Sequence, residues 1–311
     1  TKNFKLAEKH LLKATKYASN YAPAHYNLGQ AYLDQQKYHL ALAAFSKAVK
    51  LRPEYADAVF LLANTRVRLG SLAEAKLGYE LVIKLAPDNF EAHNNLGSAL
   101  QELGSVEESI AHHQRAIALT PNFELGYINL AHALVKLERN QEALEVYQDC
   151  LKHCSSAKLY QNLGVTLQQL GRMGDAQQAN LQAIQLDPAM GTAYRHLAEI
   201  TKVDSNDGID ISMIVKAGFE VQTMDENSTM HLSFAWAKIN DEQKNYPVAF
   251  AAYKQGNDIK RKEHKYNKST SNELFGHITS SYNQKFLSEA SNSGLNENKP
   301  IFILGMPRSG T

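Results

Sequence analysis

The chain has 311 residues, of which 44% are hydrophobic and 21% are charged, a balance that excludes a disordered tail and a membrane protein. Its 33 Lys and Arg against 32 Asp and Glu give a net charge of +1, which argues against a general nucleic-acid or anionic-lipid binder. Two Cys exclude a disulfide scaffold, and 17 Gly with 8 Pro favour long helices over a β fold with many turns.

The chain begins with a helical pattern over 3–18 and then repeats itself about every 34 residues. Pro53, Pro87 and Pro121 follow one another at this step, as do five Leu-Gly or Leu-Ala pairs. The pairs are Leu28-Gly29, Leu62-Ala63, Leu96-Gly97, Leu130-Ala131 and Leu163-Gly164. Thirteen residues after each Leu stands a small residue, and four residues later stands a mostly larger one. These are Ala41, Ala75, Ser109, Ala143 and Ala176, then Phe45, Tyr79, His113, Tyr147 and Asn180.

This spacing predicts units of two antiparallel helices, A and B. The small residues let the two helices approach closely, the larger side chain fills the gap, and Pro ends helix B. One such unit cannot bury its apolar face alone, so the units must stack. The segments AHYNLGQAYLDQQKYHLALAAFSKAVKLRP (24–53) and AHNNLGSALQELGSVEESIAHHQRAIALTP (92–121) resemble the tetratricopeptide repeat family.

The resemblance implies an all-α, right-handed superhelical solenoid over residues 1–203. Whole repeats are expected at 22–55, 56–89, 90–123, 124–156 and 157–190, with partial repeats at 1–21 and 191–203. The fourth repeat has Ser155 at the Pro position, which predicts a looser exit from its second helix.

One position of helix A recurs as asparagine in four repeats, and Leu61 interrupts the row in the second repeat. The four residues are Asn27, Asn95, Asn129 and Asn162. A row of amides at one-repeat spacing on the concave wall can bond an extended peptide backbone, so we expect a groove for a protein or peptide partner. The alternative is that asparagine is simply common at this position in the family.

From residue 191 the pattern degrades, and 204–268 reads as a degenerate helical region of the same kind. Helices are predicted over 193–203 and 209–221, and repeat-like spacing returns over 234–257, with Trp236 packed between helices. Asp225 and its neighbours offer N-cap residues, and Pro247 suits the first turn of a helix. A further helix and a polar linker are expected within 269–299.

The last residues, IFILGMPRSGT (301–311), are the one segment that suggests enzymatic chemistry. Four apolar residues predict a buried strand, and Gly305 to Gly310 predict a tight turn that offers backbone N–H groups to an anion. Gly305 and Gly310 have the spacing of the ordinary nucleotide-binding loop, but Thr311 stands at its Lys position. The segment resembles the 5′-phosphosulfate loop of sulfotransferases, closest to the protein-tyrosine group.

That resemblance makes 300–311 the start of a truncated α/β sulfotransferase domain. It implies that Arg308, Ser309, Gly310 and Thr311 contact 3′-phosphoadenosine 5′-phosphosulfate (PAPS), and that Arg308 stabilises charge on the leaving phosphate. The intact parent would transfer a sulfuryl group to a hydroxyl, with protein tyrosine one possible acceptor. The family's other catalytic residues follow this loop, so this fragment is expected to be inactive. A weakly ordered 300–311 is also expected, because one strand without a sheet cannot bury its side chains.

Two alternatives stay open, a plain protein-interaction scaffold and a glycosyltransferase bearing the same repeats.

The spacing of Cys150, His153 and Cys154 could suggest a metal site. Cys150 occupies a small-residue packing position, however, so no metal site is expected. His113 is likewise expected to pack. No apolar run approaches the ~20 residues of a membrane span. A cytoplasmic location is expected, although the chain starts at Thr1 and looks cut at both ends.

Overall fold

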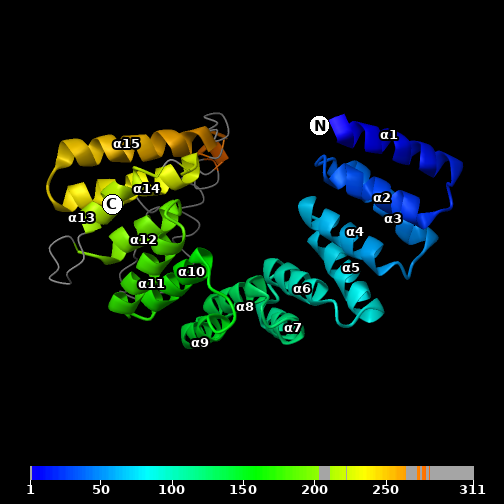
Figure 1. Cartoon of the computed structure of the whole chain (residues 1–311), viewed down its shortest axis with the longest axis horizontal. Helices are drawn as coiled ribbons and strands as arrows, with labels where there is room; N and C mark the ends of the chain where they lie inside the picture. The colour runs from blue at the N-terminus through cyan, green and yellow to red at the C-terminus, as the bar shows by residue number, and fades with distance from the viewer. Residues whose placement is uncertain are drawn as a thin grey trace. The chain divides into compact units, whose positions relative to one another are not determined.

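The computed structural model describes residues 2–202, 211–221, 223–263, 272–273, 275–277 and 280. In this part of the chain it forms fifteen α-helices with defined bounds and no strand (Figure 1). The first eight are α1 (Lys2–Tyr17), α2 (Ala22–Leu33), α3 (Tyr38–Leu51), α4 (Ala56–Arg68), α5 (Leu72–Leu85), α6 (Phe90–Glu102), α7 (Val106–Leu119) and α8 (Glu124–Lys136). The others are α9 (Asn140–Cys150), α10 (Ala157–Gln169), α11 (Met173–Leu186), α12 (Gly191–Ile200), α13 (Ile211–Gly218), α14 (Glu226–Glu242) and α15 (Tyr246–Glu263). The predicted strand and loop at 300–311 and the linker at 291–299 lie outside the described residues.

Helices α2 to α11 form five A–B pairs within the five predicted repeats, and α1 supplies the second helix of the partial repeat before them. Each A helix packs against its own B helix, and each B helix packs against the next A helix. Every helix therefore buries one face between neighbours, which is how stacked units obtain a core that one pair lacks. The helical solenoid predicted from the 34-residue spacing is confirmed for this part of the chain.

The glycines of the Leu-Gly pairs are the points of closest approach between the two helices of a repeat. A Cβ atom added to Gly29 would lie 2.6 Å from the Phe45 ring, and one added to Gly97 would lie 2.6 Å from the His113 ring. Both ring residues have no exposed surface. The predicted division of roles, a small residue on helix A and a space-filling side chain on helix B, is confirmed at these contacts.

A second recurring contact, which the sequence analysis missed, ties several of the A helices to the loop before them. His93 Nε2 lies 3.1 Å from the Pro87 carbonyl oxygen, and the Tyr127 hydroxyl donates to the Pro121 carbonyl at 3.1 Å. Tyr194 repeats this bond six residues back, to Pro188. A donor at this position thus satisfies a loop carbonyl in several repeats.

The fourth repeat, for which the absence of proline predicted a looser exit, has a shorter second helix than the other repeats. Its B helix, α9, has 11 residues, whereas α3, α5, α7 and α11 each have 14. The exit is nevertheless held by hydrogen bonds, because Ser156 Oγ accepts from the Leu159 N–H at 3.1 Å and donates to Glu124 Oε1 at 2.6 Å. The helix is shorter, and side-chain bonds stabilise the loop that follows it.

Beyond the fifth repeat the helices pack in a different order. Helix α12 packs against α11 and also against α14, while α13 lies beside both α12 and α14. Asp225 caps α14 by accepting from the Ser228 N–H at 2.7 Å, and Pro247 is the second residue of α15, as predicted for both. Trp236 packs on this cluster with its ring centroid 6.4 Å from that of Phe219.

The chain consists of two compact units, residues 1–259 and residues 260–311. Every contact described here lies within the first unit. Among the described residues, we find no helix with both the length and the apolar character required to cross a membrane.

Candidate functional site

A cavity of about 390 Å³ opens between the A helices α4 and α6, within the second and third repeats. Its polar lining comes from Asn64 of α4, from Asn95 and Ser98 of α6, and from Tyr79, which reaches the cavity from the B helix α5. Arg68 and Glu102, the last residues of α4 and α6, also line it and are exposed.

Hydrogen bonds fix the amide planes inside this cavity. Asn64 Oδ1 accepts from the Tyr79 hydroxyl at 2.6 Å and from Asn95 Nδ2 at 3.1 Å. Burial raises the pKa of Tyr79 to about 12, so the phenol remains a neutral donor at physiological pH. In the described part of the chain, Asn64 Nδ2 has no hydrogen-bond partner, so its donors can serve a ligand.

The same bonding continues into the fourth repeat. Asn129 Nδ2, on α8, donates to Asn94 Oδ1 at 2.9 Å and contacts Ser98 Oγ at 3.3 Å. Asn94 Oδ1 also lies 3.2 Å from His113 Nδ1, and Gln101 Nε2 lies 2.8 Å from His113 Nε2. For the described residues, no bond is made by Asn129 Oδ1, which leaves this oxygen as an acceptor one repeat beyond Asn95.

The four predicted asparagines do not share one environment. Asn95 and Asn129 are half-buried and belong to the network just described, Asn27 is exposed, and Asn162 is buried with its Nδ2 atom unpartnered within the described residues. The structure therefore brings two of the four together, and a peptide-binding role for the row stays a prediction. Asn64 was missed, although it stands three residues after Leu61 and so on the same face of its helix.

The ends of the first four A helices carry charges that alternate in sign at a step of 34 residues. Asp34, Arg68, Glu102 and Lys136 are all exposed, and each is the last residue of its helix or directly follows it. Two of them, Arg68 and Glu102, flank the cavity between α4 and α6. The rim thus offers an ion-pairing group of each sign to whatever lies in the cavity.

Cys150 occupies a packing position, as predicted, and Cys154 packs against the same core. Cys150 is fully buried in the core around α8, α9 and α10, and Cys154 Sγ lies 3.3 Å from the Asn122 carbonyl oxygen. No cluster of three or more metal-ligating side chains occurs among the residues that the structure describes. Burial, together with the nearby Cys154, raises the pKa of Cys150 to about 12.

We expect one of the two cysteines of the native chain to react with a thiol reagent such as dithionitrobenzoate at pH 8. A pKa of about 12 leaves Cys150 with about a thousandfold less thiolate than an ordinary cysteine, and its burial excludes the reagent. Absorbance should report one reacted thiol in buffer and two after unfolding in guanidinium. The variant Cys154→Ser should show almost no fast reaction, and a fast reaction of that variant would contradict the packing described here.

Tetratricopeptide repeat profiles match the chain at residues 22–55, at 60–122, and at 126–152 with 157–190. Together these matches span just over half of the sequence. The fold and the cavity define the chain as a helical-repeat protein with a polar surface on its A helices. The repeat profiles place it more narrowly: it belongs to the tetratricopeptide repeat family.

Several solved structures are similar to the chain. YrrB, described as a TPR protein with an unusual peptide-binding site, is 23% identical, covers 58% of this chain and 94% of its own, and has a TM-score of 0.49. The MamA protein is 21% identical, with coverages of 54% and 92% and a TM-score of 0.49. A thermophilic TPR protein from Thermus thermophilus is 17% identical, with coverages of 58% and 98% and a TM-score of 0.47. No protein with a curated description matches the chain.

Proposed function

We propose that this chain is a protein-interaction scaffold that holds an extended peptide along the A helices of its second to fourth repeats. The observation that carries the proposal is the hydrogen-bonded asparagine network, which leaves a donor on Asn64 and an acceptor on Asn129. An extended backbone presents N–H and C=O groups in alternation, and amides bond both.

The network also favours binding energetically. Asn64 and Asn95 are held by each other and by Tyr79 before any ligand arrives, so little side-chain entropy is lost on binding. Hydrogen bonds from these amides would be made to the peptide backbone, so the site would accept peptides of many sequences. The exposed charges of Arg68 and Glu102 at the cavity can then select among peptides by charge.

The test begins with peptides selected from a random display library against the full chain. For the tightest peptide, we expect the double variant Asn64→Ala/Asn95→Ala to weaken binding about tenfold in fluorescence anisotropy, because one or two hydrogen bonds are lost. Asn20→Ala is the matched control, since Asn20 is exposed in the loop before α2. Equal peptide affinity of the double variant and the control variant would contradict the proposal.

The finer prediction, that the intact parent is a PAPS-dependent sulfotransferase, rests on residues 301–311, which lie outside the described part of the chain. It stays a prediction about a longer polypeptide, with Arg308 to Thr311 as the PAPS-binding residues. In such a protein the scaffold would present the acceptor to the catalytic domain. Calorimetry with PAPS on the longer polypeptide tests it, and uptake of another phosphorylated compound in its place would reject it.

A further inference from the structure

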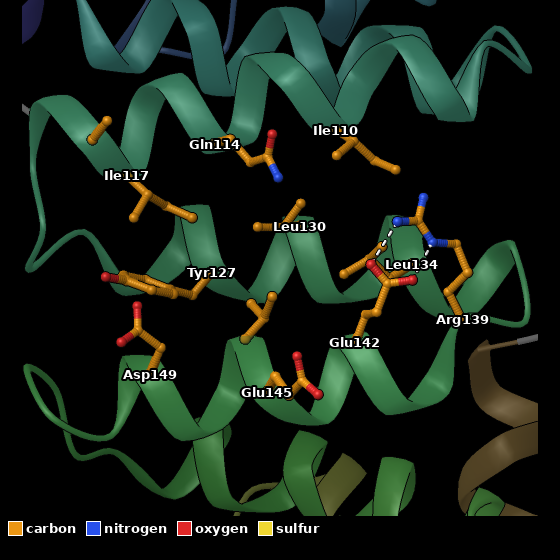
Figure 2. A pocket seen from close by; sticks show the side chains of 12 residues that line it. Ile110, Gln114, Ile117, Tyr127, Leu130, Leu134, Arg139, Glu142, Glu145 and Asp149 are labelled. Atoms are coloured by element: carbon orange, nitrogen blue, oxygen red, sulfur yellow. Dashed lines mark hydrogen bonds and ion pairs between the residues drawn. The ribbon is translucent and has the colours of Figure 1, made fainter.

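A second hollow lies on the side of the B helices, away from the asparagine network. It is a cleft with a volume of about 420 Å³. Figure 2 shows its lining residues on α7 and α9, with those of α8 between them. Its floor is formed by Tyr127, Leu130 and Leu134 of α8, and Ile110 and Ile117 of α7 form one wall. The cleft exists because each A helix packs between two B helices, so successive B helices stand apart over it.

The next repeat contains an equivalent cleft, of about 300 Å³, between α9 and α11. Tyr160, Leu163 and Leu167 of α10 form its floor, each 33 residues after its counterpart in the first cleft. Each cleft also ends on an ion pair between an arginine and a carboxylate. Arg139 contacts Glu142 through two bonds of 2.6 Å, and Arg172 contacts Asp175 at 2.6 Å in the corresponding place.

The two clefts differ in charge. On the wall formed by α9, the first cleft carries Glu145 and Asp149, and Figure 2 shows both carboxylates at its edge. At the corresponding positions of α11, the second cleft carries Gln178 and Gln182. Arg139 is paired with Glu142, and Asp149 is paired with Lys152 at 3.0 Å. Among the described residues, Glu145 is therefore the one carboxylate of the first cleft without an ion-pair partner, whereas the single carboxylate of the second cleft, Asp175, is paired with Arg172. The neutral counterpart shows that the fold of a repeat does not require these carboxylates.

We propose that the cleft between α7 and α9 binds an apolar side chain of a partner polypeptide whose neighbouring residues are Lys or Arg. The apolar floor stabilises the buried side chain, and the unpaired carboxylate of Glu145 at its edge attracts a flanking cation. A volume of about 420 Å³ is at the small end of ligand sites and suits one or two side chains rather than a large cofactor.

This surface is distinct from the asparagine network, because no residue of that network lines the cleft. A protein with both sites would hold two peptide segments at once, and linked segments gain affinity through effective concentration. The proposal on the B helices can therefore hold or fail without regard to peptide binding on the A helices.

The experiment uses the full chain and three fluorescent peptides of equal length, with the cores Lys-Leu-Lys, Lys-Ser-Lys and Glu-Leu-Glu. We expect the Lys-Leu-Lys peptide to bind at least about tenfold more tightly than the other two in anisotropy, and its affinity to fall with added salt. The variant Glu145→Gln/Asp149→Gln gives the first cleft the residues of the second, and should weaken the Lys-Leu-Lys peptide about tenfold. Glu91→Gln is the control, because Glu91 is exposed in the first turn of α6 and lines neither this cleft nor the A-helix cavity, and it should change nothing.

Each contrary outcome overturns the proposal. Equal binding of the Lys-Ser-Lys peptide means that the apolar floor is not used. Equal loss in Glu91→Gln means that general charge, and not this cleft, attracts the peptide. Unchanged affinity in Glu145→Gln/Asp149→Gln means that the peptide binds elsewhere. A concentration-dependent increase in mass in sedimentation, blocked by the peptide, would assign the cleft to a second copy of the chain instead.

Discussion

Replacing Gly191 with alanine is expected to destabilise the packing of α12 against α14 by about 3 kcal/mol. A Cβ atom at Gly191 would overlap the backbone carbonyl of Ser228, whose carbon and Cα atoms both lie 2.6 Å from that Cβ position. A flexible side chain could turn aside, but a backbone held by the Asp225 cap cannot move without displacing the start of α14. Gly191 is the first residue of α12, so the conflict occurs where the helices meet.

The effect can be localised, because Trp236 is the sole tryptophan and packs on the cluster formed by α12, α13 and α14. We expect Gly191→Ala to lower the unfolding midpoint reported by Trp236 fluorescence more than the midpoint reported by far-ultraviolet circular dichroism. Gly174→Ala in α11 is the matched control, since its Cβ would meet nothing within 4 Å. That change should stabilise by up to about 1 kcal/mol through helix propensity. Equal midpoints for the two variants would refute the close approach.

The repeats could be predicted from the sequence because the constraint on each contact is local. Gly29 and Phe45, or Gly97 and His113, are separated by the same number of residues in each repeat, so one spacing rule describes both contacts. The pairing of α12 with α14 follows no such rule. Residues 201–225 stand between the two helices, and the contact of Gly191 with Ser228 depends on how that segment is accommodated.

The candidate site was predicted in part. Two members of the predicted asparagine row, Asn95 of α6 and Asn129 of α8, lie in the amide network, because residues one repeat apart lie on equivalent faces. It did not identify Asn64, which lies one helical turn after Leu61, the residue that interrupts the row. It also did not identify the buried Asn94, whose Oδ1 atom contacts both Asn129 and His113. The 34-residue spacing identifies residues at equivalent positions of successive repeats. A hydrogen-bond network depends instead on the length and orientation of each side chain, which differ from repeat to repeat.

The stability of the chain should fall as the pH drops below about 6.5, and His113 should be a major cause. Burial lowers the pKa of His113 to about 4, with the neighbouring His112 as a smaller cause. Between pH 4 and 6.5 the unfolded chain therefore binds a proton at this residue that the folded chain does not. Stability rises with pH in this window and is lost as the pH falls, by about 2 kcal/mol at pH 5 and about 3 kcal/mol at pH 4 relative to pH 8.

The comparison that isolates this residue is His113→Phe, which places at this position the aromatic side chain that Phe45 provides in the first repeat. The variant loses the bonds to Asn94 and Gln101, so its stability at pH 8 can differ from that of the parent in either direction. The expected result concerns the slope: urea unfolding from pH 8 to pH 4 should cost the variant about 3 kcal/mol less than the parent. His93, His112, His132 and His196 also have lowered pKa values and remain in both proteins, so the difference between the two profiles reports His113 together with its coupling to the adjacent His112. Parallel pH profiles for parent and His113→Phe would show that the buried ring is not the group that titrates.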